Sequence, residues 1–199
     1  MTTTVKTPAP AAAAWQIDPA HSNVEFAVRH LMISTVKGRF GEVQGMVMMD
    51  EADPTRAAVD VTIGTASIDT RAEQRDQHLR SPDFFDVEHF PTMTYRSRRV
   101  DVRADGGLSV VGDLTIRGTT REVALAASPE GRGRDPWGGE RAGFSATAKI
   151  NRRDFGLTWN QVLEAGGVAV GDEVKISLDI ELVRQAAQAA QAAQAAQAA

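Results

Sequence analysis

Alternation of apolar and polar residues with a period of two is the feature of this sequence that most constrains its fold. The run 24–29 reads Val-Glu-Phe-Ala-Val-Arg, and the run 174–182 alternates Val, Ile and Leu with Lys, Ser, Asp and Glu. The same alternation recurs at 59–63, 108–116 and 144–151. Because successive side chains of a strand point to opposite faces, each segment has one dry and one wet face. One-sided burial of this kind is typical of antiparallel sheets.

Glycine-rich turns separate these segments, as at 104–107, 117–118 and 171–172. Short strands with such turns indicate a sandwich or a barrel, and roughly eight strands suit a closed barrel that holds one small ligand. The polar run 72–80 predicts a short helix, followed by an irregular turn over 81–86. The stretch 129–139, dense in Gly, Pro and charge, predicts a surface loop. The expected fold class is therefore all-β, an antiparallel barrel with a short helix.

Composition divides the chain into three parts. Residues 185–199 are five copies of Gln-Ala-Ala, and residues 1–14 contain mainly Thr, Pro and Ala. Segments of such low complexity bury little surface, so we expect a disordered N-terminal arm over 1–14 and a frayed tail over 185–199. The remaining 15–184 is long enough for one domain with a substantial core.

Several classes of protein and site are disfavoured. The net charge of −4 argues against a nucleic-acid binder, and the absence of cysteine excludes disulfides and thiolate metal sites. No run approaches the ~20 apolar residues of a membrane span. The first residues lack the apolar stretch of a secretion signal, which predicts a cytoplasmic protein without stable membrane insertion.

The sequence also lacks the motifs of common catalytic and cofactor sites. The four histidines lack the spacing of a helical zinc motif, and the group Asp86, Glu88 and His89 reads as a polar turn. There is no Gly-x-Ser-x-Gly elbow, P-loop or dinucleotide fingerprint. We therefore expect no metal, no cofactor and no catalytic residue.

Ordered motifs along the chain resemble a known family. These are Trp15–Ser22, Val36–Phe40, His78–Asp86, Phe90–Met93, Gly112–Gly118, Asn151–Leu157 and Val170–Val174. The chain resembles the YceI-like, polyisoprenoid-binding family from about Trp15 to Val183. This resemblance implies an extended lipocalin-like antiparallel barrel with a long isoprenoid chain inside. Many family members are periplasmic and carry a cleaved leader, a feature not recognised here.

The dry faces of the strands suit such a ligand, because each buried CH₂ contributes about 0.8 kcal/mol to binding. Small residues on the predicted inner faces, Gly64, Gly112, Ala146 and Ala148, would leave room for it, although they could equally taper a packed core. Methionines would add adaptable side chains. The residues predicted to bind the ligand are Phe26, Val28, His30, Met46, Met48, Ile63, His78, Phe84, Phe85, Met93, Leu114, Phe144, Ala146 and Ile176.

Polar partners for a head group would lie at the barrel mouth. Candidates are Arg29, His30, His78, Arg80 and Arg152, since arginine forks suit a pyrophosphate. For each of them a solvated or structural role is the simpler interpretation.

Two classes of function follow. The first is a carrier or store of an isoprenoid-type lipid without catalysis. The second is an enzyme acting on an isoprenoid or quinone, which would require His30, His78 and Asp83 to converge on the cavity. A stress-response protein with an incidental ligand is a third alternative. The sequence leaves chain length, head group and oligomeric state open, with a homodimer as one alternative.

Overall fold

The computed structural model describes residues 12–50, 52–163 and 167–185. Its elements are β1 (Ala13–Ile17), β2 (Asn23–His30), β3 (Ser34–Phe40), β4 (Val43–Met49), η1 (Pro54–Arg56), β5 (Ala58–Gly64), η2 (Thr65–Ser67), β6 (Ile68–Asp69), α1 (Glu73–Arg80), β7 (Thr92–Val102), β8 (Leu108–Ile116), β9 (Thr119–Arg134), β10 (Glu140–Asn151), η3 (Arg152–Phe155) and β11 (Val170–Arg184). Most of the predicted arm and tail lies outside the described residues. At their inner limits, β1 begins at Ala13, and the Gln185 N–H donates to the Ala14 carbonyl at 2.9 Å. The sheet thus begins two residues before the predicted boundary at Trp15.

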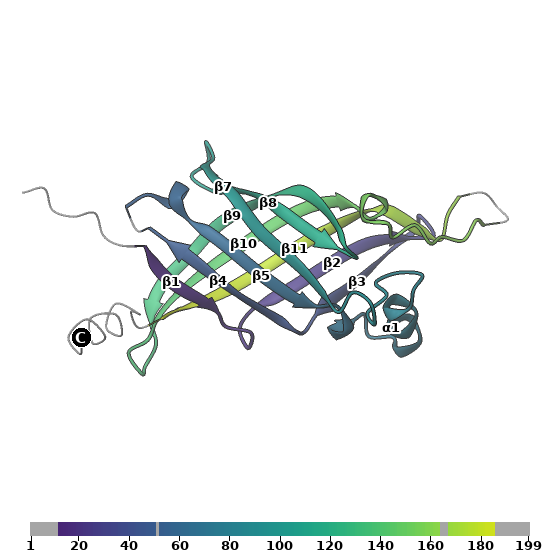
Figure 1. The fold of residues 1–199 in the computed structure, drawn as a ribbon, viewed down its shortest axis with the longest axis horizontal. Coiled ribbons are helices and arrows are strands. Elements are labelled where there is room, and N and C mark those ends of the chain that lie inside the picture. Colours follow the sequence, from purple (N-terminus) through teal and green to yellow (C-terminus); the bar gives the residue numbers. More distant parts are fainter. Residues whose placement is uncertain (1–11, 51, 164–166, 186–199) are drawn as a thin grey trace, which may run out of the picture.

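The strands form an antiparallel barrel, as predicted (Figure 1). Eight of the described strands close into a ring in the order β1-β4-β5-β7-β8-β9-β10-β11, and β11 pairs back onto β1. β11 is 15 residues long, so its free edge serves two partners in turn. Its end pairs with β1 at Ile17↔Leu182, and its beginning pairs with β2 at Ile176↔Phe26. β3 and β6 continue the sheet beyond β2.

The predicted helix is α1, which lies at the β3 side of the barrel in Figure 1. The buried carboxylate of Asp76 accepts hydrogen bonds from the backbone N–H and the hydroxyl of Thr70. The guanidinium of Arg80 donates to the carbonyls of Ala66 and Ile68. These bonds fix the helix to the β6 segment, and the residues after it turn Phe84 toward the barrel interior. No helix in the described part of the chain is long and apolar enough to span a bilayer.

The prediction of a surface loop over 129–139 is wrong for most of that stretch. β9 continues to Arg134 and pairs with β10, so that only a turn over 135–139 is irregular. The Asp135 carboxylate closes this turn by accepting from the N–H groups of Trp137 and Gly139. The residues from Ser128 to Arg134 are exposed, as their largely polar composition requires. The pairing of β9 with β10 has a register shift between Gly143 and Phe144.

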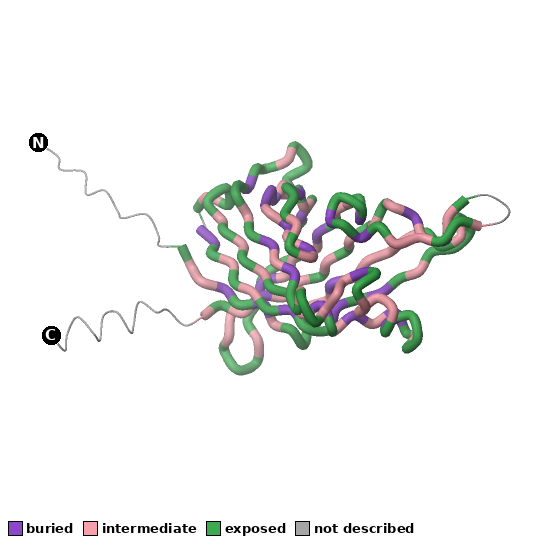
Figure 2. The backbone as a smooth tube through the Cα atoms, turned by 45° about the vertical axis from the view of Figure 1, so that its right-hand side comes forward, coloured by how far each residue is buried: buried purple, intermediate pink, exposed green. Residues whose placement is uncertain are grey.

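Burial differs along the inner faces of the strands. Trp15 and Leu182 are almost fully buried near the β1 end. Ile68 and Phe155 are almost fully buried near α1. Between these ends, inward residues such as Ile176 are only half-buried, and Figure 2 shows such intermediate positions along the strands. A half-buried residue on the inner face of a closed barrel adjoins unfilled space.

Candidate functional site

The barrel encloses an apolar cavity of about 280 Å³. Inward side chains from strands all around the ring line it, among them Ile63 on β5, Leu114 on β8, Phe144 on β10 and Ile176 on β11. Charged side chains in the lining are confined to Glu25 and Arg152 among the described residues. A concave apolar space of this kind is the usual form of a small-molecule site.

Ten of the fourteen residues predicted to bind a ligand line this cavity. They are Phe26, Val28, Ile63, Phe84, Phe85, Met93, Leu114, Phe144, Ala146 and Ile176. Each strand member of this group lies on the apolar side of its period-two pattern. Alternation in the sequence therefore identifies the inner face correctly on β2, β5, β8, β10 and β11.

The prediction that Met46 and Met48 line the interior is wrong. Their side chains lie on the outer face of β4 and are 46% and 37% exposed. Val43, Val47 and Met49 face inward instead and line the cavity. The error has a physical cause: the run Met46-Val47-Met48-Met49 is apolar on both faces, so its alternation does not identify the inner one.

The two predicted histidines do not line the cavity either. His30 is exposed at the end of β2. His78 lies on α1, where its Nε2 is 2.9 Å from Oδ2 of Asp83 and its ring packs edge-on against Phe84 and Trp159. Convergence of His30, His78 and Asp83 on the interior, which the enzyme hypothesis requires, is thus not observed.

The small residues of the predicted inner face have different roles. A Cβ at Gly112 would lie 2.3 Å from the carbonyl oxygen of Arg96, and one at Gly64 would lie 2.4 Å from a carboxylate oxygen of Glu42. Gly112 therefore permits the close approach of the β7 backbone, and neither glycine lines the cavity. Ala146 does line the cavity, and Ala148 packs against the core.

Tyr95 is a cavity residue that the sequence argument missed. Its buried hydroxyl lies 2.8 Å from the carbonyl oxygen of Val110 and 3.2 Å from that of Val123, so its single proton is shared between backbone acceptors. Burial raises the pKa of this hydroxyl well above its usual value. A signal was present, because Tyr95 has the same alternation parity as Met93 on β7.

Arg152 lines the cavity, but all its guanidinium donors are engaged. Nε donates to the Gly171 carbonyl at 2.9 Å, and the terminal nitrogens donate to the Asp172 carboxylate and to backbone carbonyls. Those carbonyls belong to Leu157, Trp159 and Val170. Burial lowers the pKa of this guanidinium. Arg152 therefore clamps the segment between η3 and β11 and has no donor left for a head group.

The remaining head-group candidates also bind their own backbone. Arg29 donates to the carbonyl of Met32 at 2.6 Å and to the hydroxyl of Thr35, across the turn between β2 and β3. Arg80 is engaged with the β6 segment as described above. Neither side chain lines the interior.

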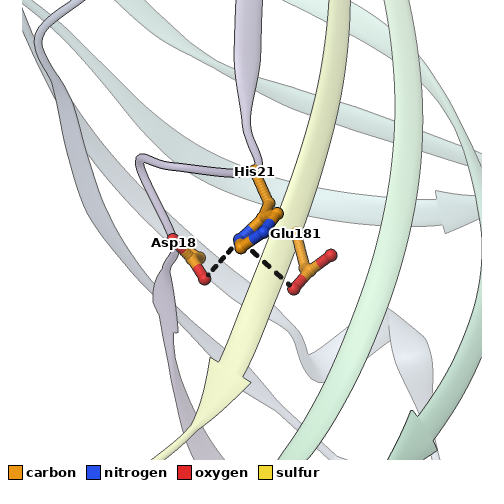
Figure 3. A group of neighbouring side chains, drawn as sticks. All are labelled: Asp18, His21 and Glu181. Carbon is orange, nitrogen blue, oxygen red and sulfur yellow. Dashed lines mark hydrogen bonds and ion pairs between the residues drawn. The ribbon is translucent and has the colours of Figure 1, made fainter. Parts of the chain in front are cut away.

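One cluster of potential metal ligands lies outside the cavity, at the β1 end (Figure 3). Oδ2 of Asp18 is 2.9 Å from Nδ1 of His21, which is 3.9 Å from Oε1 of Glu181. Arg141 donates from Nη1 to the same oxygens, at 2.7 Å for Asp18. The hydrogen bonds from His21 and Arg141 lower the pKa of Asp18 to about 2. Because the Arg141 guanidinium already donates to both carboxylates, we interpret the cluster as an ion-pair network that joins the residue after β1 to β10 and β11.

Comparison with known proteins agrees with this architecture. The chain is 39% identical over 176 residues to a UPF0312 protein of Pseudomonas paraeruginosa, covering 87% of this chain and 88% of that one. The solved structure of the Campylobacter jejuni YCEI protein matches with a TM-score of 0.68 at 31% identity, over 79% of this chain and 90% of that one. A polyisoprenoid binding domain from Saccharophagus degradans has a TM-score of 0.64 at 15% identity, over 87% and 99% of the two chains.

A family model also matches most of the chain. The model described as the YceI-like domain matches residues 15–182, which is nearly the whole barrel from β1 to the end of β11. The motifs that carry the resemblance in the sequence fall within this range. The chain belongs to the YceI-like domain family.

Proposed function

We propose that this protein carries or stores a long isoprenoid-type lipid inside its barrel, without catalysis. The observation that carries the proposal is the cavity of about 280 Å³, which is lined almost wholly by aliphatic and aromatic side chains. Such a lining gains free energy from burying a hydrocarbon chain, at about 0.8 kcal/mol per CH₂. It offers few polar groups that would orient a reacting molecule.

Two further observations support this proposal. The similar domain from Saccharophagus degradans is described as polyisoprenoid-binding. The histidine and carboxylate candidates for catalysis lie outside the cavity, with His78 and Asp83 bonded to each other. No feature of the described residues specifically favours the alternative of an isoprenoid- or quinone-modifying enzyme.

The test is to fill the cavity from one position and compare a matched outward change. Ala146→Phe on β10 projects a ring into the cavity, whereas Thr147→Phe adds the same ring to the exposed face of the same strand. Natively purified protein is extracted with organic solvent, and isoprenoid per mole of protein is quantified by mass spectrometry. We expect Ala146→Phe to lose most of the bound lipid and Thr147→Phe to keep the parental amount.

Circular dichroism first establishes that both variants retain the sheet. Equal occupancy in folded Ala146→Phe protein, or parent protein that never carries lipid, would contradict the proposal. A bulky residue at Gly112 is unsuitable for this test, because it would collide with the β7 backbone.

The cytoplasmic location and a homodimeric state remain predictions. Cell fractionation and light scattering of the purified protein test them.

A further inference from the structure

A second space lies outside the barrel wall. It is an open cleft of about 610 Å³, between the segment after α1, the turn joining β8 to β9 and the segment after η3. Its lining is mixed: Trp159 contributes an aromatic surface, and Asp83, Arg117, Thr119 and Thr158 contribute polar groups. This chemistry differs from that of the apolar interior.

One layer of residues separates the cleft from the cavity. Arg117 and Thr158 line the cleft, while the residues that precede them, Ile116 and Leu157, line the cavity. In the same way Asp83 lines the cleft and the following residue, Phe84, lines the cavity.

The wall includes an aromatic contact. The rings of Phe84 and Trp159 lie 5.3 Å apart between centroids, and His78 packs edge-on against both. A lipid chain in the cavity could reach the cleft if the Phe84 and Trp159 rings separated.

Arg117 is unusual both in its backbone and in its side chain. It occupies the left-handed region at φ 49°, followed by Gly118 at φ 70°, and together they form the two-residue turn between β8 and β9. Turns with two positive φ angles favour Asn, Asp or Gly, so arginine is a strained choice here. Within the described residues the Arg117 guanidinium makes no hydrogen bond or ion pair. A strained, unpaired cation beside a cleft points to a binding role.

We propose that this cleft binds the head group of the lipid whose chain lies in the barrel, and that the head group is an oxyanion held by Arg117. The inference rests on the proposed function. The guanidinium fork suits a carboxylate or a phosphate, and the hydroxyls of Thr119 and Thr158 supply further donors. The carboxylate of Asp83 in the same cleft disfavours a highly charged group such as pyrophosphate.

The turn itself offers a clean variant. Arg117→Asn removes the cation and places a residue that the turn geometry favours, so the fold should be kept. Arg71→Asn is the control, because Arg71 also has positive φ (62°), is exposed and does not line the cleft. Dissociation constants are measured by equilibrium dialysis for geranylgeraniol, geranylgeranoic acid and geranylgeranyl phosphate, which share one chain and differ in head group.

We expect the parent to bind at least one of the two oxyanions more tightly than the alcohol. Arg117→Asn should weaken that binding about tenfold, as expected for losing a charge-assisted hydrogen-bonded contact, and leave geranylgeraniol unchanged. Arg71→Asn should leave all three unchanged. The oxyanion whose binding is weakened by Arg117→Asn identifies the head group as a carboxylate or a phosphate.

The inference is overturned if Arg117→Asn leaves oxyanion binding unaltered or weakens all three probes equally. If the parent binds geranylgeraniol but shows no preference for an oxyanion that depends on Arg117, the head-group site is contradicted and the proposed function still stands. If the parent binds none of the three, the proposed function fails and the inference fails with it.

Discussion

The β1 end and the middle of the barrel are built from the same strands but do different things with them. On β11, Leu182 and Ile176 lie on the same inner face and both border the cavity, yet Leu182 is 2% exposed while Ile176 is half-buried. Period-two alternation thus identifies the dry face of a strand. Whether that face is packed or hollow depends on the side chains that arrive from the other strands.

At the β1 end a large side chain fills the space. Trp15 is 1% exposed, and the guanidinium carbons of Arg132 and Arg184 lie 5.4 and 5.9 Å from its ring centroid. The network of Asp18, Arg141 and Glu181 joins the strands nearby. In the middle of the barrel, inner-face residues such as Phe26 and Ile176 stay half-buried beside the cavity, so we assign stability mainly to the end and binding to the middle.

The largest expected effect comes from emptying the packed end. Trp15→Ala should lower the free energy of unfolding by about 4 kcal/mol, because it removes a fully buried ring. Phe26→Ala, beside the cavity, should lower it by only about 1–2 kcal/mol, since a ring next to empty space has fewer contacts to lose. Urea denaturation measures both. Equal losses would remove the distinction between the two regions.

The aromatic pair after α1 sharpens the comparison at the other end. Phe84 is 7% exposed and packs against His78 and Trp159, whereas Phe85 is half-buried and meets Phe40 edge-on at 5.6 Å. We expect Phe84→Ala to cost about 3 kcal/mol of unfolding free energy and Phe85→Ala less. Thermal and urea unfolding of the two variants test the order. If both changes are neutral, this segment does not plug the barrel.

The ion-pair network predicts an acid-sensitive contribution. The pKa of Asp18 is lowered from 3.8 to about 2, so its carboxylate stabilises the fold above pH 4 and that stabilisation is lost as the pH falls through 2. The loss should be about 1–2 kcal/mol. Unfolding free energy is measured between pH 2 and 6 for the parent, Asp18→Asn and the exposed control Asp179→Asn. Asp18→Asn should have a lower unfolding free energy than the parent at pH 6, and below pH 4 its unfolding free energy should change less with pH. A profile like the parent's would argue against the network.

The smallest effect is expected on the outer face of β4. Met48→Gln should change stability by less than about 0.5 kcal/mol and leave lipid occupancy unaltered, because the side chain faces solvent. Met93→Gln, on the inner face of β7, should lower both. Calorimetry measures the stability of the two variants, and lipid extraction measures their lipid occupancy. Lipid loss in the Met48 variant would indicate a binding surface outside the barrel.

The sequence carries most of the fold but only part of the site. Alternation places Phe26, Ile63, Leu114 and Ile176 on the inner face, since a strand with one polar face has only one way to bury the other. The same argument fails on β4, where both faces are apolar.

Other features depend on contacts between distant residues. Arg141 and Asp18 are 123 residues apart, and Gly112 is constrained by the backbone of β7 rather than by its own strand. The engagement of every Arg152 donor likewise follows from how the loop before β11 folds back. No local pattern in the sequence encodes these contacts.

The most direct test of a lipid-holding interior is an experimental structure of the protein purified with its native ligand, or loaded with a polyprenol. We predict continuous chain-like density between Phe26, Ile63, Leu114 and Ile176, with these side chains in contact with it. An interior closed by repacked side chains, or one that holds only ordered water after loading, would contradict this prediction.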